Sequence, residues 1–172
     1  MILVALGANL RSPDGLPPAD TLRQAAAALG ALPGIREVAL SGLWDSAPVP
    51  ISDQPRYINA VARLAGRADP AILLAALHGI EQRFGRVRGE RNAARSLDLD
   101  LLDLDGIVRV SPAPVLPHPR LASRAFVLLP LAEVAPGWRH PVTGETVDAL
   151  IAGLPEEERE ACRPILPSHP RM

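Results

Sequence analysis

The chain has 172 residues, of which 48% are hydrophobic and 22% charged, a composition that suits one globular domain spanning 1–172. Its formal net charge of -1 at pH 7 excludes a general electrostatic attraction to nucleic acid or to an anionic membrane. All 18 basic residues are arginine, and the lack of lysine excludes the lysine-dependent chemistry of P-loop enzymes, protein kinases and Schiff-base enzymes.

The cysteine content and the lengths of the apolar runs bear on the cellular compartment of the protein. Cys162 is the only cysteine, so the chain has no intramolecular disulfide and no cysteine-rich metal site. The apolar runs are interrupted before they reach spanning length, and Met1 leads into an apolar run without a basic leader. We therefore expect a cytoplasmic monomer that has no nucleic-acid partner and no membrane partner.

The first elements in chain order are a strand, a helix and a strand. Residues 1–6 form a continuous apolar run that predicts a short buried strand. Pro17 and Pro18 then open an alanine-rich helix that Gly30 can close. Residues 35–43 follow with imperfect alternation, which favours a mostly buried strand.

The middle of the chain begins with an irregular loop. Three prolines within residues 45–55 restrict the backbone and argue against regular structure there. Residues 57–64 return to a strand pattern. Asp69 and Pro70 are typical of an N-cap and first helical turn, and we expect that helix to run to about Phe84.

Beyond an arginine-rich loop, residues 97–104 give the clearest strand signal. Asp105 and Gly106 predict a hairpin turn into a returning strand at 107–110. A second proline-rich loop occupies residues 111–119.

Two weaker helices are expected at 125–134 and 146–153, followed by a polar, loosely held tail after about residue 155. Strands joined both by hairpins and by helices predict an α+β sandwich with a mainly antiparallel sheet.

Two carboxylates lie on the strand with the clearest signal. Because side chains alternate along a strand, Asp98 and Asp100 share one face while the leucines between and beside them point into the core. Alternate residues are roughly 6.5 to 7 Å apart, so the pair can hold one or two hard cations through oxygen. The alternative is an ordinary amphipathic strand with a solvated acidic face. Asp103 and Asp105 belong to the strand end and the turn.

The segment before this pair is basic. Five arginines near an acidic strand predict a polyphosphate site in which guanidinium groups and metal ions share the phosphate charge. A solvated basic loop remains the interpretation for Arg83 and Arg91. The five are Arg83, Arg86, Arg88, Arg91 and Arg95.

His118 lies between two prolines, which stiffen the segment and fix the imidazole, so we expect it to face phosphate as a donor, with Arg124 nearby. His140 and His169 carry no comparable context and are interpreted as surface residues.

Several motifs together resemble, in the same order, those of the hydroxymethyldihydropterin pyrophosphokinases. The resemblance runs from the first strand to about Leu150. Its motifs are Leu6-Gly7-Ala8-Asn9-Leu10, Asp53-Gln54-Pro55-Arg56-Tyr57-Ile58-Asn59-Ala60-Val61, Glu81 with Gly85-Arg86-Val87-Arg88, Arg95-Ser96-Leu97-Asp98-Leu99-Asp100, and Pro117-His118-Pro119-Arg120 with Arg124-Ala125-Phe126-Val127-Leu128.

The resemblance implies a ferredoxin-like α+β fold and the transfer of pyrophosphate from ATP to 6-hydroxymethyl-7,8-dihydropterin, with release of AMP, in folate biosynthesis. It also implies site roles. The metal ligands for two Mg²⁺ ions are Asp98 and Asp100, and the residues on the transferred phosphates are Arg86 and Arg95. The residues around ATP are Glu81, Arg88, Arg95, His118 and Arg124. The pterin residues are Ser46, Ala47, Pro48, Val49, Tyr57, Asn59 and Phe126.

Two other functions are compatible with parts of the pattern. A two-metal phosphodiesterase or nuclease could use the same carboxylates, but it gives no account of Tyr57, Asn59 and Phe126, and the near-neutral charge argues against a nucleic-acid partner. A non-catalytic nucleotide-binding module would bind ATP without releasing AMP when the pterin is present. From the residues alone, Tyr57 and Phe126 are equally compatible with plain core packing.

Overall fold

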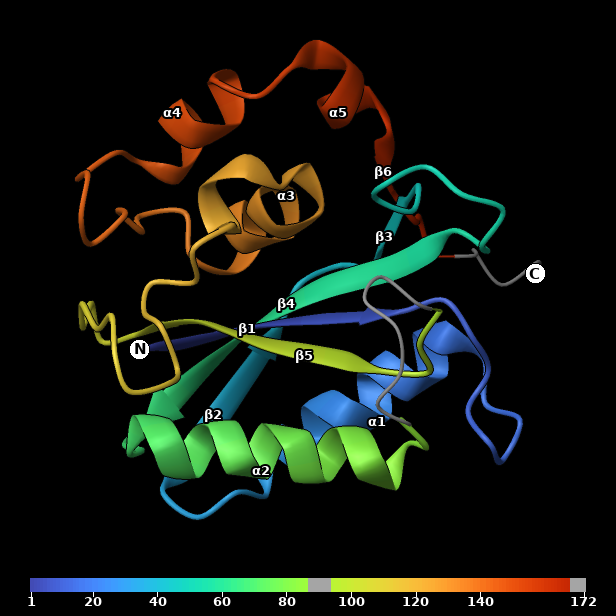
Figure 1. The fold of residues 1–172 in the computed structure, drawn as a ribbon, viewed down its shortest axis with the longest axis horizontal. Coiled ribbons are helices and arrows are strands. Elements are labelled where there is room, and N and C mark those ends of the chain that lie inside the picture. Colours follow the sequence, from blue (N-terminus) through green and yellow to red (C-terminus); the bar gives the residue numbers. More distant parts are fainter. Residues whose placement is uncertain (87–93, 168–172) are drawn as a thin grey trace.

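A six-stranded sheet forms the centre of the molecule in the computed structural model, which describes residues 1–86 and 94–167 (Figure 1). Its path runs β5-β1-β4-β3-β6, and β2 also pairs with β4. The pairs among these strands are antiparallel, which confirms the predicted α+β class. The strands are β1 (Ile2–Ala8), β2 (Ile35–Leu40), β3 (Trp44–Ser46), β4 (Tyr57–Gly66), β5 (Asp98–Leu104) and β6 (Cys162–Pro164).

Helices cover both faces of this sheet. Helices α1 and α2 lie on one face, and α3 and α4 lie on the other, as Figure 1 shows. The elements β1, α1, β2, β4, α2 and β5, with β5-β1-β4-β2 as their order in the sheet, give the expected ferredoxin-like arrangement. The helices are α1 (Pro18–Gly30), α2 (Pro70–Arg83), α3 (Ala125–Val134), α4 (Val147–Ala152) and α5 (Glu156–Glu160), with a short 3₁₀ turn η1 (Leu121–Ser123) before α3.

The alternation of side chains along β1 divides the core in two. Ile2, Val4 and Leu6 pack under α1 and α2, whereas Leu3 packs under α3 and α4. Apolar side chains therefore point to both faces of a central strand, which is why the first residues read as a continuous apolar run rather than as an alternating one.

The expected helices form close to their predicted bounds. The side chain of Asp69 caps α2 by accepting hydrogen bonds from the backbone N–H groups of Ala71 and Ile72, each at 3.0 Å. Strand β2 ends at Leu40 instead of residue 43, and β3 then continues along β4, although the proline-rich loop was expected to begin at residue 45. Residues 44–46 are thus strand, because β4 offers them backbone partners.

The predicted strand at 107–110 is wrong. Asp105 and Gly106 make a turn with positive φ angles of 51° and 72°, but the returning chain forms only an isolated bridge between Arg109 and Leu116. The carbonyl of Leu102, on β5, accepts its hydrogen bond from the N–H of His118 at 2.8 Å. A later segment therefore takes the place beside β5 that the hairpin would have filled.

The tail after residue 155 was expected to be loosely held, and this expectation is wrong for residues 156–164. These residues form α5 and β6, and β6 pairs with β3. Cys162 is buried against the core under α3 and α4. Strand pairing uses backbone groups, so a polar composition did not reveal it.

None of the helices in the described part of the chain is both long and apolar enough to cross a membrane.

Candidate active site

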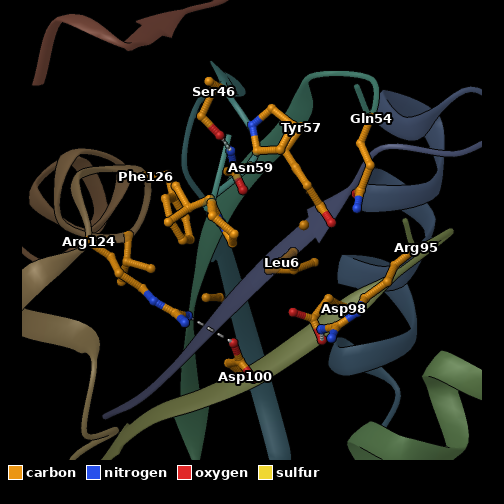
Figure 2. Close-up of a pocket in the computed structure, with 17 residues that line it drawn as sticks. Leu6, Ser46, Gln54, Tyr57, Asn59, Arg95, Asp98, Asp100, Arg124 and Phe126 are labelled. Carbon is orange, nitrogen blue, oxygen red and sulfur yellow. Dashed lines mark hydrogen bonds and ion pairs between the residues drawn. The ribbon is translucent and has the colours of Figure 1, made fainter. Parts of the chain in front are cut away.

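A pocket lies on the α3 side of the sheet (Figure 2). Residues of β1, β4 and β5 line it together with residues of the first turn of α3. Most of the residues assigned from sequence line it, although they come from distant parts of the chain. Those residues are Ser46, Ala47, Pro48, Val49, Tyr57, Asn59, Arg95, Asp98, Asp100, Arg124 and Phe126.

Three other predicted residues lie beside the pocket without lining it. Arg86 and His118 face the acidic pair from the rim of the pocket, and Glu81 is buried behind β5. Arg88 lies outside the described residues, as do Arg91 and His169.

The acidic pair has the geometry expected from strand alternation. Asp98 and Asp100 are half-buried at the pocket, while Leu99 and Leu101 are buried in the core under α1 and α2. Burial and, to a lesser extent, the charge of the neighbouring Asp98 raise the pKa of Asp100 to about 6, and the charge of Arg124 opposes the change. Ionising both carboxylates is therefore costly unless positive charge is nearby.

The donor set fits a hard cation that also binds phosphate. Among the described residues, no cluster of three or more acidic, histidine or cysteine side chains could form a complete metal cage. Mg²⁺ ordinarily binds through one or two carboxylates, with substrate phosphates and water completing its octahedron. Two neighbouring carboxylates are consequently sufficient from the protein.

Two guanidinium groups converge on Asp98. Its Oδ1 atom lies 2.7 Å from Nη1 of Arg86 and 3.0 Å from Nη1 of Arg95. Arg86 also contacts Oε1 of Glu81 at 2.6 Å, and the same oxygen accepts the backbone N–H of Leu99 at 2.8 Å. Burial raises the pKa of Glu81, whereas the hydrogen bond from Leu99 and the charge of Arg86 lower it. Glu81 thus fixes both the strand that carries the acidic pair and the arginine that faces it.

His118 is held as a neutral donor. Its Nδ1 atom accepts the backbone N–H of Arg120 at 3.2 Å, so in the neutral ring the proton lies on Nε2, which is 4.0 Å from Oδ2 of Asp100. Burial, together with the charges of Arg124 and Arg120, lowers the pKa of His118 to about 4. At neutral pH the ring therefore offers an N–H toward the acidic pair and carries no charge.

Arg124 lies between the acidic pair and the aromatic ring of Phe126. Its Nη1 atom lies 3.9 Å from Oδ2 of Asp100, and its guanidinium carbon lies 5.4 Å from the centre of the Phe126 ring. As the residue immediately before α3, Arg124 projects from the helix toward β5, as Figure 2 shows.

Aromatic and amide groups form the other half of the pocket. Tyr57 and Asn59 are two residues apart on β4 and both line the pocket, with Phe126 facing them from α3. The Nδ2 group of buried Asn59 donates to Oγ of Ser46 at 2.5 Å. Gly7 lies next to this amide, and a Cβ at that position would approach Oδ1 of Asn59 to 3.3 Å.

Sequence reasoning gave no role to Asn9, which ties three parts of the site together. The Nδ2 group of this buried side chain donates to Oε1 of Gln54 and to the carbonyl of Pro55, both at 3.1 Å. Its Oδ1 atom accepts the backbone N–H of Arg95 at 2.8 Å. The sequence placed Asn9 in a motif, but its partners lie about 45 and 86 positions away and leave no local signal.

Comparison with known proteins gives one consistent result. The model of the 7,8-dihydro-6-hydroxymethylpterin-pyrophosphokinase family matches residues 3–136. The chain is similar to the 2-amino-4-hydroxy-6-hydroxymethyldihydropteridine pyrophosphokinase of Pseudomonas aeruginosa, with 41% identity over 91% of this chain and 93% of that protein. It is 37% identical to the protein of the same name from Synechocystis, over 99% of this chain and 81% of the relative.

Solved structures show the same fold. A Plasmodium falciparum HPPK-DHPS chain superposes with a TM-score of 0.67 over 88% of this chain, at 13% sequence identity. The present chain covers 42% of that longer protein, so the likeness concerns one part of it.

Proposed function

Since the chain belongs to the 7,8-dihydro-6-hydroxymethylpterin-pyrophosphokinase family, and is a pyrophosphokinase of folate biosynthesis, we propose how its pocket performs the transfer. ATP is the co-substrate, and 6-hydroxymethyl-7,8-dihydropterin accepts the pyrophosphate. The hydroxymethyl oxygen of the pterin attacks the β-phosphorus of ATP in line. A bond from that oxygen to the β-phosphorus forms, and the bond from the β-phosphorus to the oxygen that bridges it to the α-phosphate breaks. AMP leaves with the bridging oxygen, and the hydroxyl proton passes to solvent.

The acidic half of the pocket takes the polyphosphate. Asp98 and Asp100, which line this half, would hold Mg²⁺, as two ions in our proposal, and the metal would supply charge neutralisation and orientation of the phosphate oxygens. Arg95 and Arg86 already lie against Asp98, so a bound phosphate gives their guanidinium groups a second anion at short range. His118 and Arg124 donate to the nucleotide from the opposite rim. Arg88 is assigned to the nucleotide on the resemblance alone.

Glu81 supports this half indirectly. We assign it a positioning role, because its carboxylate holds the backbone of Leu99 between the two aspartates and also holds Arg86. This differs from the direct ATP contact that the resemblance implies.

The aromatic half takes the pterin. Tyr57 and Phe126 present ring faces to a flat heterocycle, while Asn59, Ser46 and the backbone of residues 47–49 pair with its polar edge. A neutral ring system with several donors and acceptors suits an apolar pocket with a few fixed polar groups.

One observation carries the proposal, namely that a single pocket has two chemically different halves. One half is formed by aromatic and amide side chains and the other by carboxylates and arginines, and Arg124 is in contact range of both. An acceptor bound at one half would point its hydroxyl toward phosphates bound at the other. Such positioning of two reactants supplies much of the rate enhancement of a transfer reaction, and it requires no strong general base.

The test is an assay of the purified protein with ATP, Mg²⁺ and 6-hydroxymethyl-7,8-dihydropterin, in which AMP and the pterin pyrophosphate are followed together. We expect equal amounts of both products, and none without the pterin or with a metal chelator. Formation of ADP, or of AMP without pterin, would contradict the proposed transfer.

A matched variant tests the division of the pocket. Asn59→Ala should weaken pterin binding by roughly 1 to 3 kcal/mol, because it leaves polar groups of the ligand unpaired in a buried site, and should leave ATP affinity nearly unchanged. Equal losses for the two ligands in calorimetry would contradict the assignment of Asn59 to the pterin half.

A further inference from the structure

The polar edge of the pterin half depends on a very short strand. β3 has three residues, and its last residue, Ser46, accepts the hydrogen bond from Asn59 and leads directly into residues 47–50 of the pocket wall. A strand of this length makes few backbone hydrogen bonds, so its position depends on what holds its two edges.

One edge of β3 pairs with β4, and the other pairs with β6 near the end of the chain (Figure 1). In this register Ser46 lies opposite Cys162, and Asp45 lies opposite Arg163. The backbone N–H of Ile165 donates to the carbonyl of Leu43 at 2.8 Å, which extends the pairing beyond β3. The partner of the pocket strand is therefore a segment 116 to 120 positions further along the sequence.

Arg56 strengthens the same junction. Its Nε group donates to Oδ1 of Asp45, and its Nη2 group donates to the carbonyl of Ala161 at 3.1 Å. Cys162 is buried against the core under α3, which anchors the segment from the other side. The first part of β3 has a separate anchor, because Glu133 of α3 accepts hydrogen bonds from the backbone of Gly42 at 2.7 Å and from the indole of Trp44 at 2.8 Å.

We propose that residues 161–165, here named the C-terminal brace, are a positioning element for the acceptor substrate: they fix β3 and thereby the placement of Ser46 and the pocket wall that follows it. The brace touches neither substrate. It acts through the strand whose last residue faces the pterin edge, and in this respect the inference rests on the proposed function.

The sheet order makes the effect selective. β5, which carries Asp98 and Asp100, is separated from β3 by β1 and β4. Loosening the brace therefore displaces the pterin edge while the acidic pair and its arginines keep their own supports in Glu81 and Asn9. A general loss of stability would not discriminate between the two substrates.

The decisive variant is Ile165→Pro, which removes the N–H donated to Leu43 without changing any residue of the pocket. Leu166→Pro, one position further along at a side chain that is exposed, is the matched control. Arg56→Ala removes the hydrogen bonds of Arg56 to Asp45 and to the carbonyl of Ala161. Arg56→Lys retains a positive charge near Asp45 with a single donor group.

We expect Ile165→Pro and Arg56→Ala to raise the pterin dissociation constant and KM about five- to tenfold, with ATP affinity within about twofold of the wild type and kcat at saturation preserved. Arg56→Lys should fall between Arg56→Ala and the wild type, and Leu166→Pro should match the wild type. Amide hydrogen exchange should accelerate in residues 43–47 and not in β5.

Unchanged pterin affinity in both Ile165→Pro and Arg56→Ala, or equal losses for pterin and ATP, would overturn the brace. If Ile165→Pro fails to fold, the Arg56 pair decides by the same criterion. A wild-type protein that binds ATP but not the pterin would instead overturn the proposed function and the brace with it.

Discussion

Among the residues that the structure describes, two arginines lie within 3.0 Å of Asp98, whereas the nearest cation to Asp100, Arg124, lies at 3.9 Å. The two carboxylates are equivalent by sequence, since both lie on one face of β5, but the surrounding charges differ. Asp98 is neutralised by close ion pairs, and the pKa of Asp100 is raised by burial and by its neighbour. Asp100 is therefore the member of the pair that gains most from added positive charge.

This difference predicts a pH-dependent effect of Asp100→Asn on stability. A carboxyl whose pKa is raised to about 6 in the folded state stabilises the protein at low pH, and that contribution is lost as pH rises through 6. The variant should therefore be more stable than the wild type at pH 8 without divalent metal, by on the order of 1 kcal/mol after solvent screening, because a third of the side chain is exposed.

The advantage should shrink as pH falls and vanish below about 4, where Asp100 is protonated in both states. Denaturant unfolding at pH 4, 6 and 8 measures it. The same variant should lose Mg²⁺-dependent turnover. A variant less stable than the wild type at pH 8 would show that Asp100 is favourably ionised, contrary to its surroundings.

Arg86 gives a second prediction at this scale. In the structure its guanidinium bridges Glu81 and Asp98, and in the proposed reaction it moves onto phosphate as charge develops. Arg86→Ala should then lower kcat by about a hundredfold or more while changing the dissociation constants of ATP and pterin little, which single-turnover kinetics with separate binding measurements can resolve.

The double variant Arg86→Ala/Glu81→Gln separates catalysis from folding. Arg86→Ala alone leaves the buried Glu81 carboxylate without its cation and should cost about 1 to 3 kcal/mol of stability. Neutralising Glu81 should recover most of that stability and none of the rate. A single variant that loses affinity by the same factor as rate would make Arg86 a ground-state anchor.

At the scale of elements, α2 connects folding to the site through its last turn. Its first turn is fixed by the Asp69 cap, and Glu81 near its other end holds β5. The two ends are about 18 Å apart at the usual helical rise. Stability and site geometry can thus be altered separately on one helix.

Asp69→Ala should lower the free energy of unfolding by about 1 kcal/mol, because the N–H groups of Ala71 and Ile72 lose their acceptor. In thermal unfolding this corresponds to a fall in Tm of about 2 to 4 °C, with substrate affinities unchanged. Asp69→Asn, which can cap equally well, is the control. A loss of the same size in both variants would show that the cap does not account for the effect.

At the scale of the whole molecule, the two faces of the sheet serve different purposes. The face under α1 and α2 is closed by a continuous apolar core. The other face is covered by α3 and α4 over only part of its length, and the pocket occupies the remainder. Buried Asp103 anchors this covering layer by accepting a hydrogen bond from the indole of Trp138 at 2.8 Å. The pocket exists because the covering helix stops short of the strand ends.

Local sequence was sufficient to predict a structural feature wherever the residues that cause it are neighbours in the chain. The cap at Asp69, the alternation around Asp98 and Asp100, and the turn at Asp105 and Gly106 follow from the preferences of neighbouring residues. The fold class followed from the order of such elements. Most residues that the resemblance assigned to a site line one pocket, and their individual roles stay predictions. The residues alone left Tyr57 and Phe126 compatible with core packing.

Tertiary structure alone decided which segments complete the sheet and which groups neutralise one another. β6 beside β3, His118 beside Leu102 in place of the expected hairpin, and Asn9 between Gln54 and Arg95 join residues far apart in the chain. Such pairings satisfy the hydrogen-bonding groups of the backbone, which every residue has, or of side-chain amides, which are common. They therefore leave no distinctive local pattern in the sequence. Their partners are selected by packing of the whole chain, which no short stretch of sequence contains.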